Sequence, residues 1–276
     1  MVCSQLPRRR RDLVSLGPSQ LDAVGGRTAL VTGAGQGLGR QIALALSRAS
    51  ARVIAVDLQD DRLAETAGLL EDTGASVRIA ICDVSDAESV RELADTLSDE
   101  EVSILINNAG VPGPVKALLE IEPEEWDNVF AVNVRGVYLM CRAFVPPMVE
   151  RGRGDVINLA SVSGKRPLAR RTPYCASKMA VIGLTVTLAA EVGPLGVIVN
   201  SLSPGPVRGP RMERNFRLEA ERLGVSYEEA EHAFVSRSLL SRLIEEVEVG
   251  RAIVAMLNMP GLHAADIDLS AGMVAR

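Results

Sequence analysis

The chain has 276 residues, of which 47% are hydrophobic and 24% charged, enough for one globular domain with a sizeable core. Its 30 basic and 35 acidic residues leave a net charge of −5, which gives no overall attraction to nucleic acid or anionic membranes. The four cysteines form no C-x-x-C pair and only two histidines accompany them, so we expect no metal site. Free thiols suit a reducing cytoplasm, where we expect the protein to reside.

The first 20 residues differ from the rest of the chain. Arg8, Arg9, Arg10 and Arg11 are not followed by an apolar segment, so no secretory signal is predicted. The longest apolar tract, 179–190, is shorter than the ~20 residues that span a membrane, and no membrane partner is expected. The arginines could form an anion-binding arm, but a solvated, poorly ordered leader before a domain at 21–276 is favoured.

The first predicted strand, 27–33, runs directly into the sequence TGAGQGLG at 32–39, and a helix is predicted from 38 to about 49. Glycines in such a turn let the backbone approach a pyrophosphate, and the N-terminus of the next helix attracts the anion. Because the glycines lie between a strand and a helix, we predict a dinucleotide-binding turn.

The second predicted strand, 52–57, ends in Asp57. A carboxylate at this place can accept hydrogen bonds from the adenosine ribose, and it repels a 2′-phosphate. Gln36 in the glycine turn is neutral, and no basic residue directly follows Asp57. The sequence therefore favours NAD over NADP, although Asp57 could instead serve only as a helix or turn cap.

Strands and helices then alternate to the end of the chain. Further strands are predicted at 76–84, 103–110, 155–161, 196–205 and 265–270, and helices at about 61–72, 86–98, 124–150, 173–192 and 245–257. This alternation predicts an α/β fold: a single doubly wound, Rossmann-type parallel sheet with helices on both faces.

Residues 206–242 interrupt the alternation with two charged helical stretches, about 211–223 and 227–237. Segments this long without a strand are usually functional in a compact domain. We expect this helical insert to be a mobile lid that closes over the substrate and excludes water.

The helix at 173–192 carries Tyr174 and Lys178, which lie four residues apart and so project from one helix face. An ammonium group beside a phenol favours the phenolate, which would let the tyrosine exchange a proton near neutral pH. The pattern also arises by chance, so its meaning depends on the other motifs.

Taken in order, the motifs resemble the short-chain dehydrogenase/reductase family, in its shorter one-domain branch. The matching segments are TGAGQGLG, NNAG at 107–110, VNVRG around Asn133, NLASVSG around Ser161, YCASK, and SPG at 203–205. The ordered set, which extends from about residue 21 to the C-terminus, is far more specific than any single motif.

The resemblance implies a role for each matching residue. Tyr174 would be the general acid/base, Lys178 would assist it and hold the nicotinamide ribose, and Ser161 would orient the substrate oxygen. Asn133 would hold a water molecule that links Lys178 to solvent. The remaining implied contacts are with the cofactor NAD, through Gly33, Gln36, Gly37, Leu38, Gly39, Asp57, Asp83, Val84, Asn108, Tyr174, Lys178, Pro204, Gly205 and Val207.

Two segments depart from the family pattern. The run SPGPVRGP lacks the threonine that often anchors the nicotinamide carboxamide, although backbone groups near Val207 could serve. The ending DLSAGMVAR replaces a frequent Asp-Gly-Gly. The resemblance implies a homo-oligomer, a tetramer or dimer, and many relatives assemble through that last strand.

Substrate identity should depend on 111–115, 162–171 and the insert. The second segment carries Lys165, Arg166, Arg170 and Arg171 without an acid, so a carboxylate or phosphate could bind there. A solvated loop or subunit contact is favoured.

We expect an NAD-dependent oxidoreductase that interconverts a secondary alcohol and a ketone, for example a cyclic polyol, a sugar-like alcohol or a terpenoid. One alternative is an NADPH-dependent ketoreductase of acyl substrates, against which Asp57 argues. Another is a non-catalytic dinucleotide-sensing protein, although the complete set of catalytic residues argues against it. A nucleic-acid binder that uses Arg8–Arg11 is the most distant alternative.

Overall fold

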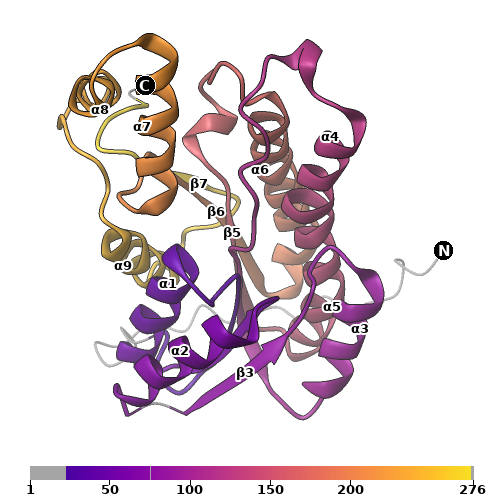
Figure 1. Ribbon diagram of the computed structural model, residues 1–276. Coiled ribbons are helices and arrows are strands. Elements are labelled where there is room, and N and C mark those ends of the chain that lie inside the picture. Colours follow the sequence, from indigo (N-terminus) through magenta and orange to yellow (C-terminus); the bar gives the residue numbers. More distant parts are fainter. Residues whose placement is uncertain (1–22, 75, 275–276) are drawn as a thin grey trace.

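The computed structural model describes residues 23–74 and 76–274, and within them one parallel sheet of seven strands forms the centre of the molecule (Figure 1). The predicted doubly wound α/β fold is confirmed. The strand order is β3-β2-β1-β4-β5-β6-β7. The strands are β1 (Thr28–Thr32), β2 (Arg52–Asp57), β3 (Val77–Ile81), β4 (Val102–Asn107), β5 (Gly154–Leu159), β6 (Val197–Pro204) and β7 (Asp266–Leu269).

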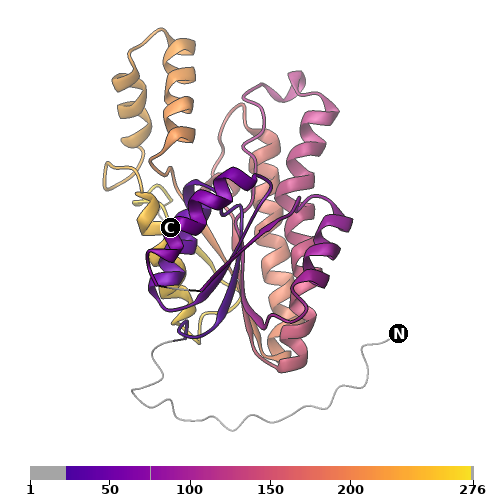
Figure 2. The same ribbon diagram turned by 60° about the horizontal axis from the view of Figure 1, so that its bottom comes forward.

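Helices cover both faces of this sheet (Figure 2). They are α1 (Gly37–Arg48), α2 (Asp60–Glu71), α3 (Ala87–Thr96), α4 (Pro123–Phe130), α5 (Gly136–Arg151), α6 (Thr172–Val192), α7 (Pro210–Leu223), α8 (Tyr227–Val235) and α9 (Glu246–Leu257). On one face α1, α2 and α9 bury apolar side chains against the sheet, and on the other α3, α5 and α6 do so. The central strands β1, β4 and β5 are buried along their whole length, which explains their nearly continuous apolar sequences.

The chain reverses its winding direction between β1 and β4. From β1 it proceeds outward through β2 to β3, and it then returns to form β4 on the other side of β1. Beyond the carboxyl ends of two such strands, the connecting segments diverge and leave a crevice, where open α/β sheets bind their ligands. The glycine turn after β1 and the NNAG segment after β4 therefore lie beside each other.

The predicted continuous helix at 124–150 is wrong in one respect. Between α4 and α5, residues Ala131–Arg135 form a π-helical turn, with Asn133 at its centre and fully buried. Such π-turns insert one extra residue into a helix and re-aim the side chains there, and they are frequent at functional sites. Hydrophobic periodicity does not reveal them because the flanking turns keep their α-helical spacing.

The helices at 123–151 and Thr172–Leu195 are long and apolar enough to cross a membrane by length and composition alone. In this structure both pack on the sheet as core helices: α5 buries Met140 and Met148, and α6 buries Val181 and Ala189. Their apolar character is therefore accounted for in part by the core.

The insert at 206–242 forms a helical hairpin above the sheet, and we call it the lid (Figure 1). Its helices α7 and α8 have a small core of their own, in which Phe216 packs edge-on against Tyr227 and Phe234. At its base, Val207 pairs with Ile244 in a parallel bridge, so the lid leaves and rejoins the domain at adjacent points.

Candidate active site

The glycine turn is held against the NNAG segment by a compact set of hydrogen bonds. The Asn108 side-chain amide donates to the carbonyl oxygens of Thr32 (2.9 Å) and Gly33 (3.2 Å). The Thr32 hydroxyl accepts from the backbone N–H groups of Asn108 and Ala109, each at 3.0 Å. These bonds fix the crevice between β1 and β4.

Two glycines are required by this geometry. Gly33 has a left-handed backbone (φ +65°), and a Cβ there would lie 2.9 Å from the Cα of Ala109. At Gly39, a Cβ would overlap the carbonyl oxygen of Gly33. Because α1 begins at Gly37, its free N–H groups open onto this narrow turn, which suits the pyrophosphate of a dinucleotide. Of the other predicted contacts, Gln36 is the exposed N-cap residue of α1, and Leu38 is half-buried against the core.

Asp57 ends β2 and points its carboxylate at the same turn. One oxygen accepts from the backbone N–H of Gly35 at 2.9 Å, and the other accepts from Leu58 at 2.8 Å. Both the capping role and the ribose-binding role are therefore open to it, since a carboxylate has about four acceptor sites.

Two arginines also lie beside the turn, although neither is adjacent to Asp57 in the sequence. Arg40 donates to the Gly35 carbonyl at 2.5 Å and forms an ion pair with Glu65 at 2.8 Å. The Arg62 stem lies next to Gly35, where a Cβ on the glycine would be 3.0 Å from the Cβ of Arg62. Sequence spacing missed both, because helices α1 and α2 bring them to the turn from outside the motif.

The other predicted cofactor contacts lie at the same edge of the sheet. Asp83 follows β3, and its carboxylate accepts from the backbone and hydroxyl groups of Ser85. Val84 is buried against Gly136. Pro204 ends β6, Gly205 donates its N–H to the Leu269 carbonyl at 2.8 Å, and Val207 belongs to the bridge at the base of the lid.

Tyr174 and Lys178 lie one turn apart in the first half of α6. The Lys178 ammonium nitrogen is 5.9 Å from the centre of the Tyr174 ring and donates to the Leu159 carbonyl at 2.6 Å. Lys178 is only 6% exposed. Burial, with a smaller contribution from the positive charge of Arg211, lowers the pKa of Lys178 to about 7.

Asn133 connects the π-turn to α6 and to the NNAG segment. Its side-chain amide donates to the Ser177 hydroxyl and to the Val111 carbonyl, each at 3.0 Å, and its oxygen accepts from the Val111 N–H at 2.8 Å. Gly110 lies between Asn133 and Lys178, since a Cβ there would be 3.1 Å from the Asn133 oxygen and 3.6 Å from the Lys178 nitrogen. The π-turn thus brings Asn133 to within reach of the lysine.

Ser161 follows β5 at the same edge and is nearly buried. Its hydroxyl accepts from the backbone N–H of Ser163 at 3.1 Å, which leaves the hydroxyl proton free to donate. The turn that contains Ser163 packs closely on α6, because a Cβ at Gly164 would lie 2.9 Å from the backbone of Lys178. The four residues named for catalysis therefore come from three separate elements that meet at one edge of the sheet.

Residues 27–221 match the family model described as short chain dehydrogenase. The chain belongs to the short-chain dehydrogenase family. The resemblance inferred from the motifs is confirmed.

Curated relatives of this short-chain dehydrogenase include D-threitol dehydrogenase of Mycolicibacterium smegmatis, which is 41% identical over 181 residues, 65% of this chain and 69% of the relative. The (3R)-3-hydroxyacyl-CoA dehydrogenase of Canis lupus familiaris is 37% identical over 198 residues, 67% of this chain and 76% of the relative.

Two solved structures illustrate the range of cofactors among its structural neighbours. An NAD+-bound xylitol dehydrogenase superposes with a TM-score of 0.85 at 25% identity, covering 90% of this chain and 99% of the other. A variant of actinorhodin polyketide ketoreductase with NADPH also gives 0.85, at 30% identity, covering 90% and 97%.

In the basic segment 162–171, Lys165 has acid partners. Lys165 contacts Asp266 and Asp268 on β7, and Asp266 also accepts from the hydroxyls of Ser201 (2.7 Å) and Ser203 (2.8 Å). Lys165 is therefore not solvated, as the favoured interpretation of this segment held, but joins the loop to the edge strand.

Arg171, at the other end of that segment, is 8% exposed and lies immediately before α6. Its guanidinium donates to the Pro112 carbonyl at 3.2 Å and contacts the side-chain oxygen of Asn215 on α7. Arg211 on the same lid helix donates to the Gly110 carbonyl at 3.3 Å. These contacts join the lid to the edge of the sheet that carries Tyr174 and Lys178.

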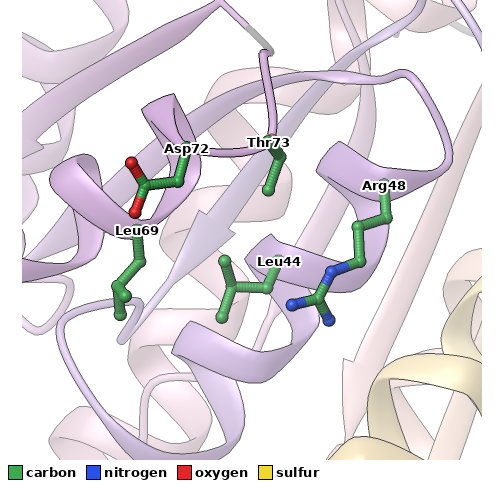
Figure 3. Close-up of a pocket in the computed structure, with 5 residues that line it drawn as sticks. All are labelled: Leu44, Arg48, Leu69, Asp72 and Thr73. Atoms are coloured by element: carbon green, nitrogen blue, oxygen red, sulfur yellow. The ribbon is translucent and has the colours of Figure 1, made fainter.

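A shallow pocket lies elsewhere, between the last turns of α1 and α2 (Figure 3). Its lining residues are Leu44, Arg48, Leu69, Asp72 and Thr73. Since α1 starts at the carboxyl edge of the sheet and runs back, this pocket lies at the opposite, amino edge. None of its lining residues belongs to the candidate site.

Proposed function

We propose that the protein is an NAD-dependent oxidoreductase that interconverts a secondary alcohol and a ketone. The observation that carries the proposal is the convergence of Tyr174, Lys178, Asn133 and Ser161 beside a glycine turn shaped for a dinucleotide. The bound nicotinamide would supply the hydride acceptor or donor.

In oxidation, the Tyr174 phenolate takes the proton of the substrate alcohol. In reduction, the Tyr174 phenol donates a proton to the substrate oxygen. Ser161 donates a hydrogen bond to the same substrate oxygen and holds it near Tyr174. Lys178 has a low pKa in the free protein, so its charge responds to a neighbouring phenolate or ligand. Asn133 keeps the loop at Val111 and the start of α6 in register, and a proton relay through it remains a prediction.

Replacing Tyr174 with Phe tests the reaction. We expect Tyr174→Phe to lower kcat by about 100-fold or more, since the proton acceptor is lost while the ring remains. Turnover is followed as absorbance of the reduced cofactor at 340 nm, with polyols, hydroxy acids and terpenoid alcohols as substrates. NADH binding by this variant should match that of the parent chain. Undiminished turnover would remove Tyr174 as the base.

NAD is proposed as the preferred cofactor because the Asp57 carboxylate faces the turn where a 2′-phosphate would bind. We expect Asp57→Asn to lower the ratio of kcat/KM with NAD to kcat/KM with NADP about tenfold or more. The amide keeps an oxygen that can accept from Gly35, so the turn is preserved while the charge is lost. Asp60→Asn, a neighbouring exposed acid, is the control, and an unchanged ratio at position 57 would overturn the assignment.

An NADPH-dependent ketoreductase is the second candidate, and one observation favours it. Arg40 and Arg62 flank the turn, and among the described residues Arg62 has no acid within ion-pair distance. If NADPH is preferred and Arg62→Gln removes the preference, this candidate replaces the first.

We further propose a small-molecule substrate, a homo-oligomeric assembly and a cytoplasmic location. The free thiols Cys82, Cys141 and Cys175 suit a reducing compartment, and burial raises the pKa of Cys141 to about 12, which keeps it inert. The predicted leader, with Arg8–Arg11, lies outside the described residues.

A further inference from the structure

We propose that the substrate carries an anionic group, a carboxylate or a phosphate, which binds to Arg171, Arg211 and Arg214 between the lid and Tyr174. This inference rests on the proposed alcohol oxidation and names the chemical class of its substrate. The three guanidinium groups would form the specificity site of the enzyme.

Arg171 is the anchor of this cluster. It is more than nine-tenths buried, yet no carboxylate within the described part of the chain lies at ion-pair distance from it. A buried charge without a counter-charge is costly unless a ligand supplies one. Its two hydrogen-bonded partners, the Pro112 carbonyl and the Asn215 side chain, are neutral and leave donors of the guanidinium available.

The lid arginines near Arg171 also add positive charge instead of offsetting its own. Burial lowers the pKa of Arg171, and the charges of Arg211 and Arg214 lower it further, whereas an ionised Tyr174 would raise it. Arg171 is thus near both the lid arginines and the catalytic phenol. Arg211 has the same effect on Lys178, so the positive field extends to the reacting atoms.

The arginines of the lid differ in whether a glutamate or an aromatic ring partners them. Arg208, Arg217, Arg222 and Arg242 each pair with a glutamate, and Arg237 stacks on Phe234 with its guanidinium carbon 5.2 Å from the ring centre. Only Arg211 and Arg214, within the described lid, have neither kind of partner.

Those two arginines lie on the face of α7 that meets Arg171. Residues 211, 214 and 215 are spaced i, i+3 and i+4 on the helix, so they share a face, and Asn215 is the residue that contacts Arg171. Arg211 reaches the Gly110 carbonyl beside Lys178. The two unpaired arginines therefore lie on the side of α7 that faces Arg171 and Gly110.

Arginine binds carboxylate and phosphate through two parallel hydrogen bonds, and both ligand types would satisfy this cluster. Because Arg171 lies one helical turn before Tyr174 and Arg211 bonds the Gly110 carbonyl, the anionic group would lie near the alcohol carbon at Tyr174 and Ser161. A short hydroxy acid or a phosphorylated polyol fits this arrangement.

The first test is binding of simple anions to the protein saturated with NADH, measured as the shift in melting temperature. Succinate and inorganic phosphate are the probes, and sodium chloride at the same ionic strength is the reference. We expect one of the two anions to raise the melting temperature by about 2 °C or more over chloride. Arg214→Gln should lose most of this shift, and Arg171→Gln should lose all of it.

Arg217→Gln is the matched control, because it lies on the same helix but pairs with Glu213. It should keep the full shift. Since Arg214 is exposed, its variant folds even if the variant of the buried Arg171 does not. Equal shifts in Arg214→Gln and Arg217→Gln, or no shift beyond chloride in the parent chain, would overturn the proposal.

The second test compares matched alcohols: 3-hydroxybutyrate with its methyl ester, and glycerol 3-phosphate with glycerol. We expect kcat/KM to favour the charged member of one pair at least tenfold, and Arg214→Gln to reduce that preference. The favoured pair identifies carboxylate or phosphate. Turnover of neutral alcohols without any anion-dependent shift would retain the oxidoreductase and discard the anion site. A shift without turnover of any alcohol would retain the site and discard the proposed reaction.

Discussion

Lys178 shows how one buried side chain links the site to stability. It lies under Gly110, donates to the Leu159 carbonyl and has almost no contact with solvent. Its charge is therefore costly in the free protein, and its pKa falls from 10.5 to about 7. The site tolerates that cost because the same burial places the amine beside Tyr174.

The pH dependence follows from this lowered pKa. Between pH 7 and pH 10.5 the unfolded chain holds a proton at Lys178 that the native protein lacks, so this residue makes stability rise with pH in that window. Below pH 7 both states are protonated and the full penalty remains. We expect Lys178→Met to be more stable than the parent chain by a few kcal/mol at pH 6, with the difference shrinking toward pH 10.

Urea unfolding at pH 6, 8 and 9.5 measures this difference. Lys116→Met is the control, because Lys116 is partly exposed and pairs with Glu125 at 2.7 Å. A stability difference for Lys178→Met that does not change with pH would contradict the assigned titration.

The positions of site residues were predictable where a motif fixes them and unpredictable where only the fold does. Tyr174, Lys178 and Asn108 stand in ordered motifs, and the structure brings them to one edge. Arg171 stood out only as one of four basic residues in 162–171, and Arg214 carried no signal, because the sequence does not tell which lid arginines pair with a glutamate. Arg40 was overlooked because α1 brings it to the glycine turn from outside the motif.

At the scale of elements, sequence patterns located every strand but extended most of them too far. The strand at 52–57 was predicted to the residue, because the apolar run is bounded by Arg52 and Asp57. The strand predicted at 103–110 ends at Asn107, since the backbone of the next residues turns to bond the Thr32 hydroxyl. The polar residues that follow a strand and form the site continue directly from its apolar run. The hydrophobic pattern therefore does not mark where the strand ends.

The strand starts are joined by a buried ion pair at the amino edge of the sheet. Arg27, just before β1, contacts Asp155 of β5 at 2.6 Å and the Ser103 carbonyl of β4 at 2.7 Å. Burial raises the pKa of Asp155, and the attraction of Arg27 only partly opposes this. The pair thus holds three strands together at an electrostatic cost.

A variant that lacks Arg27 tests how much the buried Asp155 charge costs in stability. We expect Arg27→Met to lower the free energy of unfolding by about 3–5 kcal/mol, since Asp155 is left buried without a counter-charge. The loss should be smaller at low pH, where Asp155 is protonated. Urea unfolding is the measurement, and Arg91→Met, which breaks an exposed pair with Asp95 on α3, is the control with little expected effect. Equal effects of the two variants would contradict the account.

At the scale of the whole molecule, α6 has more apolar surface than the core of a single chain buries. It is apolar around most of its circumference, yet only one side packs on the sheet. Met179 (48% exposed) and Val186 (39%) lie on its outer side, and Tyr138 of α5 (48%) is similarly exposed. A helix that is apolar on all sides is normally buried on all sides, so this surface favours self-association more directly than the edge strand β7 does.

We therefore expect the protein to be an oligomer that buries the outer side of α6. Light scattering coupled to size-exclusion chromatography should give a multiple of the chain mass at micromolar concentration. The double variant Met179→Glu, Val186→Glu should give the monomer mass, because four or more carboxylates would be desolvated in a symmetric interface. Leu58→Glu, on a more exposed apolar residue after β2, should leave the mass unchanged. A monomeric parent chain would exclude this interface, and a variant that stays oligomeric would direct the search to β7.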